Sequence, residues 1–188
     1  MDKVKFKRYY LIIFSQLVLQ ILFFILGINF NSPESNIHTS FLELLTKVQV
    51  NNVWQDFIWC LTNNIAVVFI VFWLNYWTWG IVGTLLGVNN SFILGAIFRF
   101  CFIFNSWLSV CFVILEFIAL VYSSLGGSYF RFKKDGFKKS LNLFHITDEK
   151  YSAIKTRQEK NIVINFLAIF IILFVAAVLE SIVLNSFE

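Results

Sequence analysis

The chain has 188 residues, of which 59% are hydrophobic and 14% charged, and its formal net charge is +4. Soluble domains carry roughly 25% charged residues, so this composition excludes an ordinary globular domain and indicates a protein embedded in a bilayer. The 24 phenylalanines and the single proline exclude a disordered chain. Three cysteines without a CxxC spacing argue against a disulfide scaffold or a zinc site, and we expect all three to be small buried side chains: Cys60, Cys101 and Cys111.

A basic segment precedes the first expected transmembrane helix. Four of the first eight residues are Lys or Arg, and no charge follows from Tyr9 to Ile28. This length, with no small-residue cleavage site after Gly27, predicts a retained helix at 9–28 rather than a signal peptide. The next segment, 29–56, is polar and slightly acidic, so we expect it outside the membrane. A short amphipathic helix within it would lie at the interface or pack on the bundle.

The middle of the chain is almost free of charge. From Asn63 to Gly127 the only charged residues are Arg99 and Glu116. A membrane span needs about 20 apolar residues, so this run must hold several spans. Polar turns at 88–91 and 105–106 predict spans at 66–86, 92–104 and 107–125. The span at 92–104 is short for a full crossing and could be re-entrant.

Charge distribution predicts the topology. Residues 128–160 contain nine Lys or Arg and four Asp or Glu, which places this basic loop in the cytoplasm. An odd number of crossings must then separate it from 29–56, and three satisfy this. A last apolar run forms a span at 161–184. We therefore expect a single all-α polytopic domain with about five transmembrane helices and a cytoplasmic N-terminus. The high Phe, Ile, Lys and Asn content is typical of an AT-rich bacterial genome, so we expect a bacterial cell membrane.

The two charges in the middle of the chain are the first candidate site, because ionisable groups at membrane depth usually have a function. Measured from a turn at 105–106, Arg99 and Glu116 lie at depths of roughly 9 and 15 Å. We expect them to form an ion pair between antiparallel helices. A substrate or proton site at Glu116, and contact with a partner subunit, remain open alternatives. Glu180, eight residues from the end, is expected to reach the outer interface.

Small residues share one face of the second expected span. Spacings of three, four and seven residues place them together, and they include a GxxxG pattern: Gly80, Gly83, Thr84 and Gly87. Such a face lets another helix backbone approach closely. It would form either a seam with a partner subunit or a second copy of the chain, or a tight contact inside the chain's own bundle.

The basic loop contains a candidate contact surface. Its basic residues could bind anionic lipid, and its apolar residues could dock a cytoplasmic partner such as an ATP-binding subunit. The residues concerned are Lys133, Lys134, Lys138, Lys139, Leu143 and Phe144. A third interpretation is that the loop has no partner and only determines the orientation of the chain in the membrane. Nucleic acid is not expected as a partner, because the basic residues lie directly beside membrane spans.

The sequence gives little support for catalysis. It contains no HExxH, GxSxG or glycine-rich phosphate loop, and it has only two histidines, His38 and His145. No aspartate falls in an expected span, as a paired-aspartate intramembrane protease would need. We therefore expect no enzyme, no cofactor and no metal.

The segment 63–130 resembles the stage II sporulation protein M family. The matching features are an Asn-Asn pair before a span, spaced glycines around an Asn-containing turn, and an intramembrane Glu followed by paired glycines: Asn63-Asn64, Gly80, Gly83, Gly87 to Gly95, Glu116 and Gly126-Gly127. Where family members carry Pro-His-Gly before the Glu, this chain has Cys111-Phe112-Val113.

The resemblance implies a non-enzymatic membrane subunit. Of the family's two settings we expect the one in which a small protein works beside ATP-binding subunits in maturation, export or immunity of a circular bacteriocin-like peptide. The alternatives are a scaffold of a sporulation or peptidoglycan-remodelling complex, and a self-contained small transporter in which Glu116 binds the cargo.

Overall fold

The chain folds into a bundle of long helices. The computed structural model describes the backbone of residues 3–29, 53–103, 107–144 and 148–185, and the side chains of 10–29, 54–99, 101–102, 107–132 and 161–183. The helices of this part are α1 (Lys3–Asn29), α3 (Val53–Trp77), α4 (Ile81–Ile103), α5 (Trp107–Phe144) and α6 (Asp148–Asn185). They confirm the predicted all-α fold.

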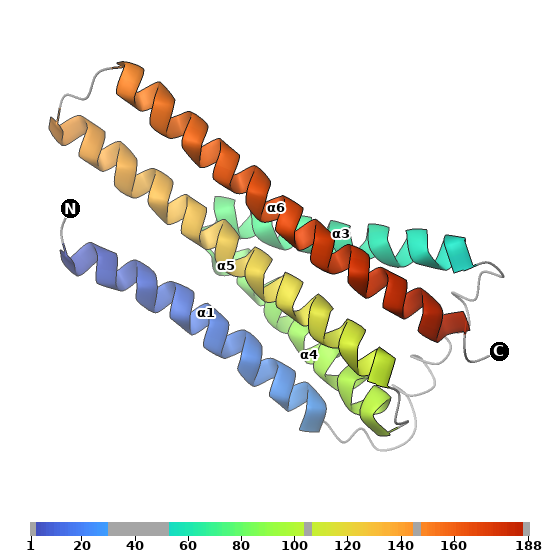
Figure 1. The fold of residues 1–188 in the computed structure, drawn as a ribbon. Coiled ribbons are helices and arrows are strands. Elements are labelled where there is room, and N and C mark those ends of the chain that lie inside the picture. Colours follow the sequence, from blue (N-terminus) through green and yellow to red (C-terminus); the bar gives the residue numbers. More distant parts are fainter. Residues whose placement is uncertain (1–2, 30–52, 104–106, 145–147, 186–188) are drawn as a thin grey trace.

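Consecutive helices run in opposite directions (Figure 1). One side of the bundle holds the start of α1, the turn between α3 and α4, the end of α5 and the start of α6. We name it the N-terminal side. The other side, which we name the C-terminal side, holds the end of α1, the start of α3, the end of α4, the start of α5 and the end of α6. The cytoplasmic location of the N-terminus stays a prediction.

All five described helices are long and apolar enough to cross a membrane. The candidate spans are Tyr10–Asn29, Trp54–Trp77, Ile81–Arg99, Trp107–Phe132 and Asn161–Val183. Large apolar side chains on the outside of the bundle are widely exposed, among them Leu11, Leu85 and Val163. A soluble protein rarely exposes so much apolar surface, whereas lipid tails solvate it without cost.

The break between the second and third spans differs from the predicted one. It lies at 78–80 and not at 88–91, which is the interior of α4. Gly80 N–H donates to Asn75 C=O at 2.9 Å, a six-residue closure of the Schellman type, and Trp79 and Gly80 both have positive φ. The expected turn residues Asn90 and Ser91 instead bond to carbonyls four residues earlier in their own helix, at 2.9 and 2.7 Å.

Moving this break removes the short middle span. The expected spans at 66–86 and 92–104 become α3 and α4, and the 23 residues of α4 extend about 34 Å, enough for a full crossing. Most of the basic segment 128–160 is helical, because α5 continues to Phe144 and α6 begins at Asp148. The expected outer segment 29–56 lies mainly outside the described residues.

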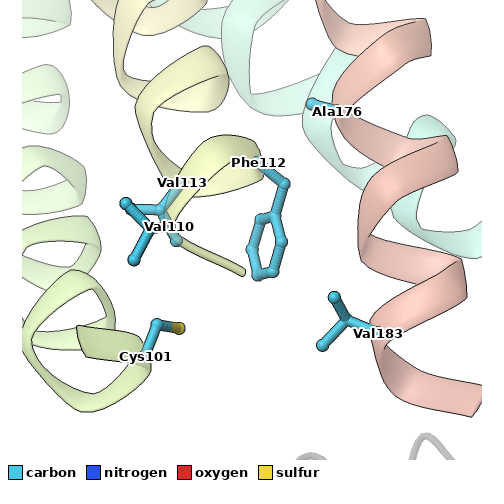
Figure 2. Close-up of a cluster of buried hydrophobic side chains, with 6 residues drawn as sticks. All are labelled: Cys101, Val110, Phe112, Val113, Ala176 and Val183. Carbon is cyan, nitrogen blue, oxygen red and sulfur yellow. The ribbon is translucent and has the colours of Figure 1, made fainter. Parts of the chain in front are cut away.

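Two apolar clusters hold the helices together. In the first, side chains of α4 and α5 meet those of α6, and Phe112 projects from α5 towards Val183 (Figure 2). The second joins α3, α5 and α6 through Val68, Ala119, Ile169 and Leu173. Both clusters include residues of α5 and α6, and they pack residues 110–119 of α5 against residues 169–183 of α6.

Helix α1 is fastened to α4 by direct backbone contact. A Cβ atom added at Gly27 would lie 2.1 Å from the Phe92 carbonyl oxygen, and one added at Gly95 would lie 2.1 Å from the Phe24 carbonyl oxygen. Only glycine permits this approach. The two positions form a reciprocal close crossing of the small-residue kind that stabilises helix pairs in lipid.

Candidate functional site: a pair of carboxyl groups within the membrane spans

Glu116 is held by a hydrogen bond from another helix. The residue lies on α5, nine positions past Trp107, or about 14 Å along the helix axis. Asn64 on α3 donates from Nδ2 to Glu116 Oε1. The carboxyl group is therefore positioned by a neutral amide and lies well inside the apolar layer.

Glu180 on α6 is the second member of the site. Its carboxyl group is in hydrogen-bonding contact with that of Glu116, and the Cys60 thiol contacts it from α3. Glu180 Oε2 is buried and has no hydrogen-bond partner among the described residues. The expectation that Glu180 reaches the outer interface is therefore wrong, because its side chain points into the bundle.

Helix geometry explains why two residues of different depth meet. Each Cα–Cβ bond tilts towards the N-terminus of its own helix, and α5 and α6 are antiparallel. Glu116 consequently points towards the C-terminal side, while Glu180, five residues before the end of α6, points back towards the middle. The small buried side chains Val113 and Ala176 flank the two residues, which lets the helices come close.

Helix α3 supplies a polar ladder beside this pair. Asp56, Cys60 and Asn64 follow at intervals of four, so they share one helix face. Asp56 is 4% exposed and Cys60 1%. The Cys60 thiol contacts Glu180 and lies near Glu116 and Asp56. The ladder extends from the C-terminal side of the bundle inwards to Glu116.

The chemistry of the pair follows from its surroundings. Two carboxylates in contact repel strongly in a medium of low dielectric constant, so at least one proton or a bound cation must accompany them. No group of three or more His, Cys, Asp or Glu among the described residues is arranged to hold a metal ion. A proton shared between the two carboxyl groups is the smallest of these partners.

The expected ion pair between Glu116 and Arg99 stays a prediction. Arg99 is on α4, whereas the groups that contact Glu116 come from α3 and α6. The contacts of Glu116 do not support an ion pair with Arg99, and that pairing stays a prediction. Of the expected buried cysteines, Cys60 and Cys101 are buried, but Cys111 is exposed on the outside of α5.

The small-residue face packs inside the bundle of a single chain. A Cβ atom at Gly83 would lie 2.4 Å from the Val71 carbonyl oxygen, and one at Gly87 would lie 3.2 Å from Gln20 Nε2. Thr84 is buried and donates to the carbonyl oxygen of Gly80. The structure thus supports the intramolecular reading of this face.

A second buried polar region lies around this face. Asn75 Nδ2 donates to the Ser124 carbonyl oxygen at 3.0 Å and to Ser124 Oγ at 2.7 Å. Gln16 Nε2 donates to the Gly80 carbonyl oxygen at 3.0 Å. We name this region the polar seam; its side chains, all under 9% exposed, are Gln16, Gln20, Asn75, Thr84, Ser124 and Ser128.

An apolar layer separates the carboxyl pair from the polar seam. On α5, Ala119 and Leu120 are 0% and 2% exposed and lie between Glu116 and Ser124. Val68, four residues past Asn64, packs with Ala119. We name these three residues the apolar barrier. The two polar regions are therefore separate compartments within the bundle.

The expected lipid or partner surface lies at the end of α5. Residues 133–144 belong to that helix, but the side chains of Lys133, Lys134, Lys138, Lys139, Leu143 and Phe144 lie outside the described part of the chain. So do both histidines. Roles for these residues remain predictions.

A comparison of the chain with protein-family models, curated proteins and solved structures finds no match. The resemblance to the stage II sporulation protein M family therefore stays a prediction. Conclusions about function depend on the geometry of the chain itself.

Proposed function

We propose that this chain is a membrane transport protein in which the Glu116–Glu180 pair binds and releases a proton. The observation that carries the proposal is the contact between two carboxyl groups within apolar membrane-crossing helices. Ionisable groups at such depth mark ion and proton pathways in membrane proteins. This function corresponds to the self-contained transporter among the readings of the sequence.

The surroundings of the pair support proton exchange rather than a purely structural role. A structural carboxyl group in lipid is normally neutralised by a cation or saturated with hydrogen bonds. Here Glu116 accepts from Asn64, while Glu180 Oε2 has no partner among the described residues. A carboxyl oxygen left in this way can accept a proton without breaking another bond. The ladder from Asp56 to Asn64 gives the proton a polar route from the C-terminal side.

An ATP-binding partner remains the expectation drawn from the family resemblance. Its expected docking residues, 133–144, have no described side chains. A proton site within the spans is compatible with either a free-standing transporter or a subunit of an export machine. The proton site is the part of the proposal that can be tested on the purified chain.

Carbodiimide labelling tests the proposal. N,N′-dicyclohexylcarbodiimide couples to protonated carboxyl groups in apolar surroundings, and peptide mass spectrometry identifies the labelled residue. We expect a label on Glu116 or Glu180 in the unmodified protein and none on either peptide in the double variant Glu116→Gln/Glu180→Gln. Asp56→Asn is the matched control, because it removes a neighbouring carboxyl group and leaves the pair.

Two results would overturn the proton assignment. One is an unmodified protein that folds but takes no label at either residue. The other is protection from labelling by sodium or potassium at constant pH, which would make that cation the bound species.

A further inference from the structure

Gln20 is a buried amide whose polar atoms are unsatisfied. It is 0% exposed, and neither its Nε2 nor its Oε1 has a hydrogen-bond partner among the described residues. It lies ten residues past Tyr10 in a span that ends at Asn29, and is therefore near the middle of the apolar layer. A polar group in that position is strongly unfavourable unless something satisfies it.

Gln16, one helical turn earlier, shows the same deficit. Its Nε2 donates to the Gly80 carbonyl oxygen, but its buried Oε1 has no partner among the described residues. The two amides lie on one face of α1 and leave one donor group and two acceptor oxygens unsatisfied. Three such atoms on neighbouring turns indicate a shared occupant.

The facing helices present small and hydroxylic residues to these amides. A Cβ atom at Gly87 would lie 3.2 Å from Gln20 Nε2 and 3.8 Å from Ser124 Oγ, which places the amide and the hydroxyl on the same patch. At Gly80, a Cβ atom would meet Gln16 Nε2 and Ser128 Oγ, at 2.1 and 2.6 Å. Gln20 thus faces Ser124, and Gln16 faces Ser128 one turn nearer the N-terminal side.

The chemistry of this strip selects the occupant. Its side chains are neutral, carry both donors and acceptors, and include none of the acidic groups that a metal cation would need. Water is the ligand that satisfies unpaired amide and hydroxyl groups in protein interiors. The strip also follows the membrane normal, since its members succeed one another along α1 and α5.

We propose that the polar seam binds a file of water molecules that conducts protons between the N-terminal side and the middle of the bundle. This inference rests on the proposed function for the proton's destination, the Glu116–Glu180 pair. Each transfer moves a proton from a hydronium to the next water, so no bond other than O–H forms or breaks. Ser124 of the seam and Glu116 are eight residues apart on α5, about 12 Å, and the apolar barrier lies between them. The polar seam and the polar ladder of Asp56, Cys60 and Asn64 are therefore two partial proton paths, one from each side of the bundle.

Thiol accessibility tests the water file. Cys60, Cys101 and Cys111 are first changed to Ser, and a single cysteine is then introduced as Ser124→Cys in the seam or Ala119→Cys in the apolar barrier. Silver ions, which are small and react with thiolates, are added to the reconstituted protein. We expect Ser124→Cys to react at least about tenfold faster than Ala119→Cys, because reactivity follows access to water. Adding Gln20→Leu to Ser124→Cys should slow the reaction by a similar factor.

Equal rates at the two cysteines would overturn the water file. If a cysteine variant does not fold, thermal unfolding of Gln20→Leu in detergent tests the same proposal. A water-filled seam predicts a lower melting temperature, because the change removes two partners of bound water. A higher melting temperature would mean that the amide is merely unsatisfied, and would also overturn the proposal.

The two proposals fail in different experiments. Carbodiimide labelling reports only on the carboxyl pair, and silver reactivity reports only on the seam. Labelled carboxyl groups with an inaccessible Ser124→Cys would retain the proposed function and reject the water file. The opposite result would retain a hydrated seam without a proton site at its end.

Discussion

The two polar regions of this bundle differ in charge, although both are buried. The region near the C-terminal side contains the carboxyl groups of Glu116, Glu180 and Asp56, on α5, α6 and α3. The polar seam nearer the N-terminal side contains amides and hydroxyls on α1, α3, α4 and α5. A neutral polar group in lipid can be satisfied permanently by a helix–helix hydrogen bond or water, whereas adjacent carboxyl groups require a mobile partner. This difference is the basis for proposing proton exchange in the first region and proton conduction in the second.

The largest expected effect distinguishes a role of the carboxyl pair in proton exchange from a purely structural role. In liposomes, Glu180→Gln should lower proton flux by about 100-fold or more, because the variant keeps the shape of the side chain and cannot ionise. A pH-sensitive dye inside the liposomes gives the measurement. Ser123→Ala is the control, since the Ser123 hydroxyl donates to the Val68 carbonyl oxygen of a neighbouring helix and does not belong to the carboxyl pair. Flux that persists in Glu180→Gln would assign the pair a structural role.

A second change acts on the contact between α1 and α4, away from the three helices that build the carboxyl pair. Gly95→Val should destabilise the protein by about 3 kcal/mol, because the new side chain would meet the Phe24 carbonyl oxygen of α1. Unfolding in detergent measures the loss. Carbodiimide labelling of the folded fraction should persist, since the carboxyl pair is built from α3, α5 and α6.

The control for that change is Gly126→Ala. The nearest atom to its new Cβ is a side-chain nitrogen of Asn165, at 3.1 Å. A side-chain amide can move, so we expect a change within about 1 kcal/mol. Similar destabilisation at both glycines would show that the backbone contact between α1 and α4 does not contribute more to stability than an ordinary side-chain contact.

Two asparagines on α3 test whether the regions differ in role. Asn75→Leu removes two hydrogen bonds to Ser124 and should cost about 1–2 kcal/mol of stability. Asn64→Leu removes the donor to Glu116, and should change proton flux more than it changes the melting temperature. If both variants lose stability and flux in the same proportion, the two regions act as one structural core.

The smallest effect is expected at the turn between α3 and α4. The Arg131 guanidinium lies 4.9 Å from the Trp79 ring centroid and 5.8 Å from that of Tyr76. Arg131→Gln should therefore lower stability by about 1 kcal/mol, and Arg131→Lys by less. Neither should alter silver reactivity in the seam by more than the scatter of replicate measurements. A large change in silver reactivity would mean that Arg131 also contributes to the polar seam.

Hydropathy and charge were sufficient to predict the five membrane-spanning helices of the described part of the chain. Runs such as 9–28 and 161–184 have no alternative to a membrane span, and the break at 105–106 also follows from local polarity. The turn at 78–80 was missed because Trp-Thr-Trp-Gly carries little polar signal. Asn89 and Asn90 carry a stronger polar signal, yet Asn90 fits inside α4 because its side chain donates to the backbone of the same helix.

The site was only half predictable, because it depends on which helices touch. Glu116 stood out by its depth, but its contact with Glu180 on α6 could not be predicted from its position in the sequence. Glu180 looked shallow when counted from the end of the chain, and only the antiparallel tilt of α5 and α6 directs it inwards. The spacing of Asp56, Cys60 and Asn64 by four was visible in the sequence and indicated a polar face on α3. The partners of that face could not be read from spacing.

The reciprocal contact of Gly27 and Gly95 limits how the molecule can change shape. Backbones that touch at these two points cannot slide or rotate past each other without losing the contact, so α1 and α4 must move as one rigid body. Any motion that opens the apolar barrier therefore belongs to α3, α5 and α6, against a fixed pair. In the proposed transporter, the glycine crossing would belong to the stationary part, and the hinge should be sought at Thr78–Gly80, where α3 joins α4.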